Sequence, residues 1–108
     1  MKTVYIACPY TKGDVAVNVR NAILMAEKVR EAGFLPFVPI LTHFWHFMSP
    51  HPYEYWTSMD LEWLHYCDCI LRIPGESSGA DAELDYNRMH LGKSVYYDIA
   101  SLVERELV

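Results

Sequence analysis

The chain alternates between two hydrophobic patterns, which predict strands and helices in turn. Short apolar runs rich in β-branched and aromatic residues predict strands over residues 2–7, 34–38, 68–73 and 94–98. Apolar residues at helical spacing, set among polar ones, predict helices over residues 14–32, 58–67, 80–91 and 99–107. Elements in this order form a parallel sheet with helices on both faces, so we expect a three-layer α/β fold of four to five strands.

Capping and chain-breaking residues support these boundaries. Asp14 suits the cap position before the first helix, and Gly33 and Gly92 suit the ends of two helices. Pro36 lacks the N–H group that a central strand needs. We therefore expect the second strand to lie at an edge of the sheet.

Residues 39–56 interrupt the alternation with a dense cluster of aromatic, His and Pro residues. This stretch is too apolar for an ordinary linker, so we expect it to form a folded lid or wall. Some of its aromatic side chains can stack on a ligand, although most aromatic residues at such density fill a core or an interface. The residues concerned are Trp45, Tyr53, Tyr55 and Trp56.

Composition narrows the class of protein. The length of 108 residues suits one domain, which we expect to span residues 1–108. The formal net charge of −5 disfavours a surface that binds long nucleic acid. No apolar run reaches the roughly 18 residues that cross a bilayer, so we expect no membrane-spanning segment. Cys67 and Cys69 lie two apart in an expected strand, where they cannot close a disulfide, and this favours a reducing cytoplasm.

Three histidines of the aromatic segment raise the possibility of a metal site. His43, His46 and His51, even with Cys67 and Cys69 as further ligands, match no standard zinc spacing. We therefore expect neither a metal nor another cofactor. His43 follows the end of a strand and is instead a candidate for ligand binding.

A ligand site is expected where two loops leave the sheet. Ligands of parallel sheets bind beyond the carboxyl ends of the strands, and residues 8–14 and 74–79 follow the first and third strands there. In the second loop Ser77, Ser78 and Gly79 precede a helix whose N-terminal N–H groups and dipole attract an anion. Serine is also a common helix cap, so a purely structural role is the alternative.

Two carboxylates are candidate catalytic groups. Asp60 lies early in the helix before the third strand, and Glu83 lies in the first turn of the helix after it. A right-handed crossover can bring both residues to one edge of the sheet. One carboxylate can then attack an anomeric carbon while another group handles protons, as in glycosidic cleavage. The alternative for Asp60 is a water-facing residue near a helix start.

Three segments resemble the nucleoside 2-deoxyribosyltransferase-like superfamily: YIACPY from Tyr5, DLEWLHYCDCILRI from Asp60, and SSGADAE from Ser77. The order of motifs agrees from about Tyr5 to Val95, and the part from DLEWL to Glu83 is the most specific. That superfamily includes deoxyribosyltransferases, 2′-deoxynucleoside 5′-monophosphate N-hydrolases and small uncharacterised relatives. The resemblance implies a flavodoxin-like, Rossmann-like fold and a cytoplasmic enzyme of nucleotide metabolism that needs no cofactor.

The resemblance also assigns roles to residues. Glu83 matches the nucleophilic Glu, Asp60 matches the Asp that holds the sugar or assists proton transfer, and Tyr5 matches a Tyr near the nucleophile. The expected substrate-binding residues lie in the two loops and the aromatic segment: Pro9, Tyr10, His43, Ser77, Ser78 and Gly79.

Ser77 bears on the choice of substrate. It lies six residues before Glu83, where the N-hydrolases have a phosphate-binding Ser and the transferases have an Asp. A Ser donates to a phosphate that an Asp would repel, so the resemblance favours a 5′-monophosphate over a free nucleoside. Two residues depart from the family pattern: Cys8 replaces the Gly of a Gly-Pro pair, and Asp81 adds a charge two residues before Glu83.

These features predict cleavage or transfer of the N-glycosidic bond of a (deoxy)nucleoside or its 5′-monophosphate through a glycosyl-enzyme intermediate on Glu83. The alternatives are a nucleotide-binding sensor without catalysis, and an accessory protein whose carboxylates only cap helices. Relatives are dimers or larger, and 15 aromatic residues are many for one small core. We therefore expect a homo-oligomer, a dimer or a tetramer, with part of residues 42–56 at its interface.

Overall fold

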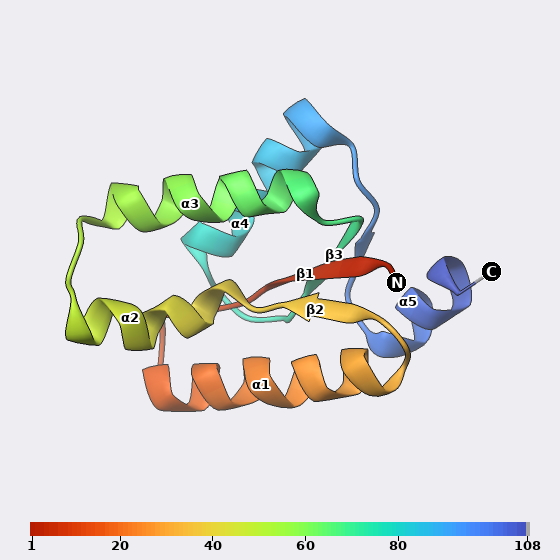
Figure 1. Cartoon of the computed structure of the whole chain (residues 1–108), viewed down its shortest axis with the longest axis horizontal. Coiled ribbons are helices and arrows are strands. Elements are labelled where there is room, and N and C mark those ends of the chain that lie inside the picture. Colours follow the sequence, from red (N-terminus) through yellow and green to blue (C-terminus); the bar gives the residue numbers. More distant parts are fainter. Residues whose placement is uncertain (108) are drawn as a thin grey trace.

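A computed structural model describes residues 1–107 of the chain, and over these residues it has one parallel sheet and five α-helices. The strands are β1 (Thr3–Ala7), β2 (Leu35–Phe37), β3 (Cys69–Arg72) and β4 (Val95–Tyr96). The helices are α1 (Val15–Glu31), α2 (Thr42–Met48), α3 (Tyr53–Tyr66), α4 (Ser78–Tyr86) and α5 (Ile99–Glu106) (Figure 1). The strand order β2-β1-β3-β4 follows the flavodoxin-like pattern. The predicted α/β fold is therefore confirmed, with the lower of the two expected strand numbers.

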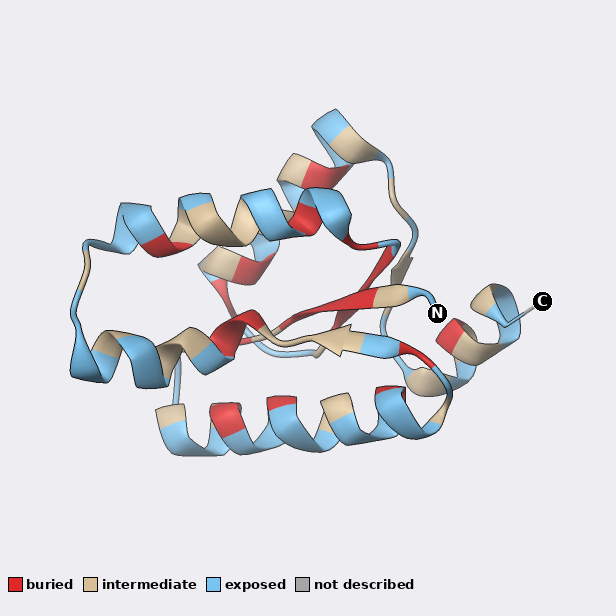
Figure 2. Cartoon of the chain, in the orientation of Figure 1, coloured by how far each residue is buried: buried red, intermediate tan, exposed pale blue. Residues whose placement is uncertain are grey.

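Alternate residues of the central strands face opposite helical layers, because successive side chains of a strand point to opposite faces. One face packs against α1 and α5 through the buried residues Val4, Ile6, Val29, Phe34, Cys69, Leu71 and Leu102. The other face packs against α3 and α4 through Tyr5, Ala7, Leu64, Cys67, Ile70 and Ala80. Buried residues accordingly concentrate on the central strands β1 and β3 and on the inner sides of the helices (Figure 2). The predicted cover of helices on both faces is confirmed.

Local signals explain several element ends. Asp14 accepts hydrogen bonds from the backbone N–H groups of Ala16 and Val17, as expected for the cap of α1. Pro36 lies in β2, which pairs only with β1 and is an edge strand, as predicted. Gly92 has a φ of 69° and ends the segment after α4, where a π-helical turn continues that helix.

The aromatic segment differs from its prediction in detail. It contains a short 3₁₀ turn (Pro39–Leu41) and the helix α2, and α3 begins at Tyr53 rather than at residue 57 or 58. Pro52 precedes this start and has a ψ of 150°, so the chain turns into α3 there without a side-chain cap. The expected wall is thus built from α2 and the start of α3, which lie at the end of the molecule farthest from the chain termini (Figure 1).

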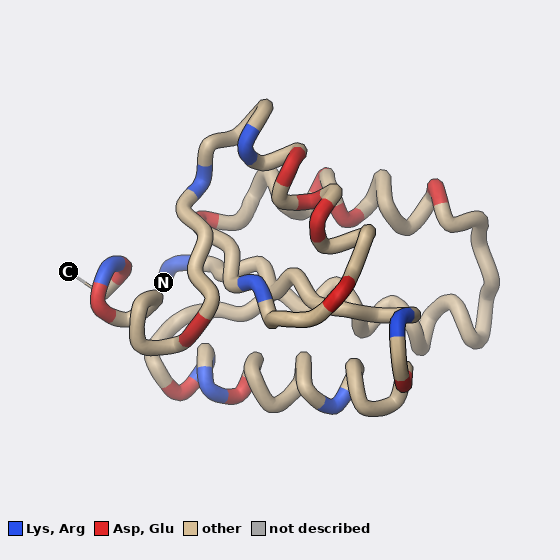
Figure 3. Tube along the Cα trace, turned by 180° about the vertical axis from the view of Figure 1, so that it is seen from behind, with Lys and Arg blue, Asp and Glu red and all other residues tan. Residues whose placement is uncertain are grey.

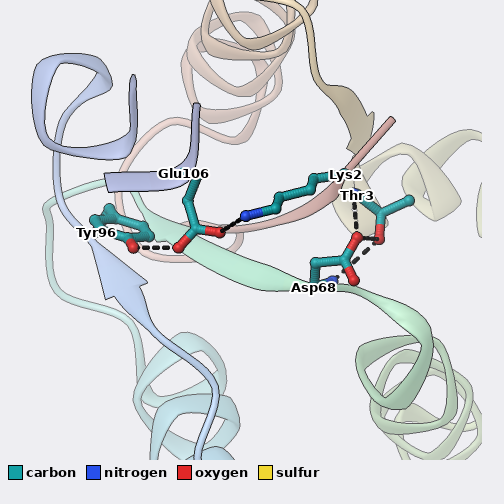
Figure 4. Close-up of polar contacts among 5 residues, drawn as sticks. All are labelled: Lys2, Thr3, Asp68, Tyr96 and Glu106. Atoms are coloured by element: carbon teal, nitrogen blue, oxygen red, sulfur yellow. Dashed lines mark hydrogen bonds and ion pairs between the residues drawn. The ribbon is translucent and has the colours of Figure 1, made fainter. Parts of the chain in front are cut away.

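Polar contacts close the amino end of the sheet (Figure 4). The Nζ atom of Lys2 donates to Oε1 of Glu106 at 3.0 Å, and the Tyr96 hydroxyl donates to the other oxygen of the same carboxylate. Oδ2 of Asp68 accepts from the backbone N and the hydroxyl of Thr3 at 2.7 and 3.1 Å. These contacts attach α5 and the start of β3 to the start of β1.

The outer surface carries mixed charge. Lys and Arg residues are distributed over several elements, with Asp and Glu residues among them (Figure 3). Among the helices formed by residues 1–107, none has both the length and the apolar character needed to cross a membrane.

Candidate functional site

The carboxyl ends of β1 and β3 open onto a cavity of about 720 Å³. Both strand-end loops contribute to its lining, and α2, α3 and α4 form the remaining walls. Seven of the residues proposed from the sequence line it: Tyr10, His43, Asp60, Ser77, Ser78, Gly79 and Glu83. The volume lies within the range of small-molecule sites.

Tyr5 and Glu83 meet below the cavity. Tyr5 is fully buried in β1 and points to the face covered by α3 and α4. Its hydroxyl donates a hydrogen bond to Oε2 of Glu83. Glu83 lies in the second turn of α4 and not in its first, because the helix starts two residues earlier than predicted, at Ser78. The contact between a β1 tyrosine and this Glu fixes one carboxyl oxygen and leaves the other for a ligand.

Asp60 lies two turns inside α3 because that helix starts at Tyr53. Its Oδ1 atom is buried and has no hydrogen-bond partner among residues 1–107. The interpretation of Asp60 as a water-facing residue is therefore wrong. A buried acceptor without a partner is costly, and a ligand hydroxyl or a proton at this oxygen would remove that cost.

The two carboxyl groups interact and titrate in an unusual range. The pKa of Glu83 is raised to about 8, mainly by burial and to a lesser extent by the Asp60 charge, while the Tyr5 hydrogen bond and the Arg72 charge oppose the rise. Burial also raises the pKa of Asp60 to about 7. Both groups therefore exchange protons near neutral pH, which is the range that general acid–base chemistry requires.

The loop before α4 forms the rim of the cavity. Ser77 is buried, and its Oγ accepts from the N–H of Ala80 at 3.1 Å, so Ser77 is the helix cap. This cap uses the hydroxyl as an acceptor and leaves its proton available to an anion. Across the rim, Nζ of Lys12 lies 3.9 Å from Oε2 of Glu76.

The loop after β1 has two roles. The Tyr10 hydroxyl lies 2.6 Å from Nδ1 of His43, and this hydrogen bond joins the loop to α2 across the cavity. Pro9 is buried and does not line the cavity. A Cβ atom at Gly75 would come within 2.8 Å of the Pro9 ring, so this glycine lets the two loops approach. Pro9 therefore contacts the other loop and not the space available to a ligand.

The histidines of the aromatic segment hold its two helices together. Nδ1 of His46 accepts from Nε1 of Trp56 at 2.8 Å and from the backbone N of His51 at 3.2 Å. Within residues 1–107 no group of three or more His, Cys, Asp or Glu residues is placed to hold a metal ion. Of the four possible stacking residues, Tyr53 and Trp56 line the cavity.

Sequence reasoning missed Arg72. This residue ends β3, is 6% exposed, and pairs with Asp81 through Nη2 and Oδ1 at 3.1 Å. Its sequence signal was weak, because an Arg at the end of an apolar strand usually extends into solvent. The pairing also gives the Asp81 carboxylate a positively charged partner.

Comparisons with known proteins agree with this architecture. A family model described as a domain of unknown function (DUF7768) matches residues 2–97. The fold is similar to that of a 2-deoxyribosyltransferase from the psychrotolerant bacterium Bacillus psychrosaccharolyticus, with a TM-score of 0.63, 20% identity, and coverage of 86% of this chain and 69% of that chain. No curated protein matches the chain in sequence. The resemblance to the deoxyribosyltransferase-like superfamily is thus confirmed in the fold.

Proposed function

The chain belongs to the family of the domain of unknown function DUF7768, and we propose that it cleaves or transfers the N-glycosidic bond of a (deoxy)nucleoside or its 5′-monophosphate. The observation that carries this proposal is the placement of Glu83, bound by Tyr5, and Asp60 at one cavity. Glycosidic cleavage through a covalent intermediate commonly uses two neighbouring carboxyl groups as catalytic groups. The similarity in fold to a 2-deoxyribosyltransferase supports the same class of chemistry.

In the proposed reaction the Glu83 carboxylate attacks C1′ of the sugar. The C1′–N bond breaks, its electron pair leaves with the base, and protonated Asp60 gives the base a proton. Water then attacks C1′, or a second base does so in a transfer reaction. Asp60 takes the proton of the incoming group, and the Glu83 carboxylate is released. Tyr5 orients Glu83 throughout by donating to its Oε2 atom.

The rim of the cavity supports a phosphate on the substrate. Ser77 and Ser78 offer hydroxyl groups beside the N-terminus of α4, and Lys12 adds a positive charge. A Cβ atom at Gly79 would lie 3.6 Å from the Tyr53 hydroxyl, so this third hydroxyl lies beside the same helix end. Glu76 opposes part of this attraction. We therefore expect a modest preference for the monophosphate, roughly tenfold to a hundredfold.

The proposal is tested by the release of free base. Nucleosides and 5′-monophosphates of the common bases are incubated with the protein, and the base is measured by chromatography. Glu83→Gln should lower the rate by several orders of magnitude, because the amide cannot attack C1′. Glu104→Gln, an exposed position on α5, is the matched control and should turn over normally. Near wild-type turnover by the Glu83→Gln protein would refute the mechanism.

A nucleotide sensor without catalysis is the second candidate. It is favoured by the raised pKa of Glu83, because a protonated Glu83 does not repel an anionic ligand. A sensor would bind monophosphates without releasing base, and Glu83→Gln would bind them as tightly as the wild type does. Binding of a monophosphate by the wild type in calorimetry, with no base released in the chromatographic assay, separates this candidate from the enzyme.

A further inference from the structure

Arg72 is the one buried cation among residues 1–107, and it lies where β3 ends below the cavity. Burying a guanidinium group is unfavourable unless its N–H groups find acceptors. The acceptors that Arg72 contacts therefore indicate the role of this buried charge.

The guanidinium group binds three acceptors in the segment that leads into α4. Nη1 donates to the carbonyl oxygen of Ile73, and Nη2 donates to the carbonyl oxygen of Gly75 at 2.9 Å and to Oδ1 of Asp81 at 3.1 Å. The first two lie in the turn after β3 and the third lies in the first turn of α4. A planar group with fixed donors holds both ends of this segment together, whereas a Lys ammonium group would not match all three.

The same charge acts on the floor of the cavity. Four groups from different elements interact with Glu83: Tyr5 from β1, Cys8 from the following loop, Asp60 from α3 and Arg72 from β3. Of these, Arg72 alone is positively charged. Its charge lowers the pKa of Glu83, against the larger effect of burial.

We propose that Arg72 is a positioning residue of this site, which fixes the backbone that presents Glu83 and supplies the positive charge that favours its carboxylate form. The inference rests on the proposed function in so far as Glu83 is the nucleophile. Asp81 has a defined part in it, since its carboxylate anchors the guanidinium group from the side of α4 and partly offsets its charge.

The test measures the pKa of Glu83 directly, in the protein without ligand, from the pH dependence of its side-chain carboxyl ¹³C resonance. Glu83→Gln identifies that resonance. Arg72→Met should raise the pKa of Glu83 by about one unit, and Arg72→Lys should leave it nearly unchanged. Asp81→Asn should lower it, because the positive charge is then less compensated. Arg88→Met is the matched control, since Arg88 forms a similar pair with Asp85 at 3.0 Å on the surface, and it should have no effect.

Activity gives a second measurement. Arg72→Met should lower kcat/KM at pH 6 about tenfold, because a pKa one unit higher leaves a tenfold smaller fraction of Glu83 ionised. Arg72→Lys keeps the charge but loses the planar guanidinium group that binds three acceptors. It should therefore lower kcat/KM by a factor that is the same at every pH. A purely structural role of Arg72 would predict no change in the titration of Glu83.

An unchanged pKa of Glu83 in folded Arg72→Met protein would overturn the inference. If that variant does not fold, Asp81→Asn decides, and an unchanged pKa there overturns it equally. Failure of the proposed function is recognised separately. In that case the titration responds as expected, and the wild-type protein releases no base from any compound tested.

Discussion

Tyr5, Asp60 and Glu83 come from three elements and meet at one buried place. The resemblance assigned these three residues to one site, and the geometry shows how they interact. A sequence could not show that Asp60 has a buried oxygen without a partner, because this depends on where α3 begins. Arg72 was missed for a related reason, since burial of a charge depends on acceptors that only the folded chain supplies.

The raised pKa values predict the pH dependence of catalysis. Below about pH 7 both carboxyl groups are protonated, so Glu83 cannot attack. Above about pH 8 both are ionised, so Asp60 has no proton for the leaving base. Between these values the reactive form, with Glu83 ionised and Asp60 protonated, is the less populated of the two singly protonated forms, but its share is greatest there. We expect a bell-shaped profile of kcat/KM with its maximum between these values, measured under first-order conditions. A profile that stays level from pH 5 to 9 would exclude this pair as the acid and the nucleophile.

Replacement of Asp60 tests its part in proton handling. Asp60→Asn should lower turnover by about 10²- to 10⁴-fold, because the amide cannot donate the proton. The descending limb of the pH profile should also disappear. Folding should be affected little or improved at pH 8, because the folded state of the wild type then holds a buried charge that the variant lacks.

The raised pKa of Asp60 also predicts how the stability of the fold changes with pH. The pKa of Asp60 is raised on folding, so the folded state keeps a proton that the unfolded state loses between about pH 4 and pH 7. The contribution of Asp60 to stability is therefore present below this window and is lost across it as the pH rises. Thermal unfolding of the wild type and of Asp60→Asn at pH 4, 6 and 8 checks the expectation. An Asp60→Asn protein that melts far below the wild type and still turns over would make Asp60 a structural residue.

At the level of elements, the hydrophobic pattern predicts the bounds of a helix well where local and tertiary preferences agree. The helix α1 has both a capping Asp14 and regular apolar spacing, and its predicted bounds are nearly those observed. The start of α3 was missed because Tyr53, Glu54 and Tyr55 are exposed, so no apolar period marks the first turn. Contacts between Trp56 and His46, ten residues apart, stabilise that part of the wall instead.

Ser77 both caps α4 and lines the rim of the cavity. Ser77→Ala removes the cap of α4 and should cost about 1 kcal/mol of stability, measured by chemical unfolding. It also removes a hydroxyl donor from the rim, so the preference for monophosphate over nucleoside should fall. Calorimetry with both ligands on the Glu83→Gln background, with and without Ser77→Ala, measures that preference. Equal affinity for the two ligands before Ser77 is replaced would mean that Ser77 is a cap and nothing more.

For the whole molecule, the outer face of α2 is the most exposed apolar surface near the cavity. Phe47 and Met48 are 79% and 84% exposed, and Phe44 lies beside them on the same helix. Large exposed apolar side chains in a group are typical of an interface. We propose that this face lies between subunits of a homo-oligomer, a dimer or a tetramer.

Light scattering at micromolar concentration tests the assembly. The wild type should have a mass of at least twice 12.5 kDa. Phe47→Glu should shift it toward the monomer, because burying a carboxylate at the interface is unfavourable. Met89→Glu, at a position 70% exposed on the segment after α4, is the control and should leave the mass unchanged. A stable monomer of the wild type would remove the proposal.

The ion pair between Lys2 and Glu106 brings the two ends of the described chain together at the amino end of the sheet (Figure 4). The cavity opens at the carboxyl ends of the strands, on the opposite side. An affinity tag, a fluorescent fusion or a surface linker at either end is therefore attached far from the cavity mouth. Molecules immobilised in this way are held by the end opposite the mouth, so on a sensor chip or a catalytic resin the cavity stays accessible to small molecules.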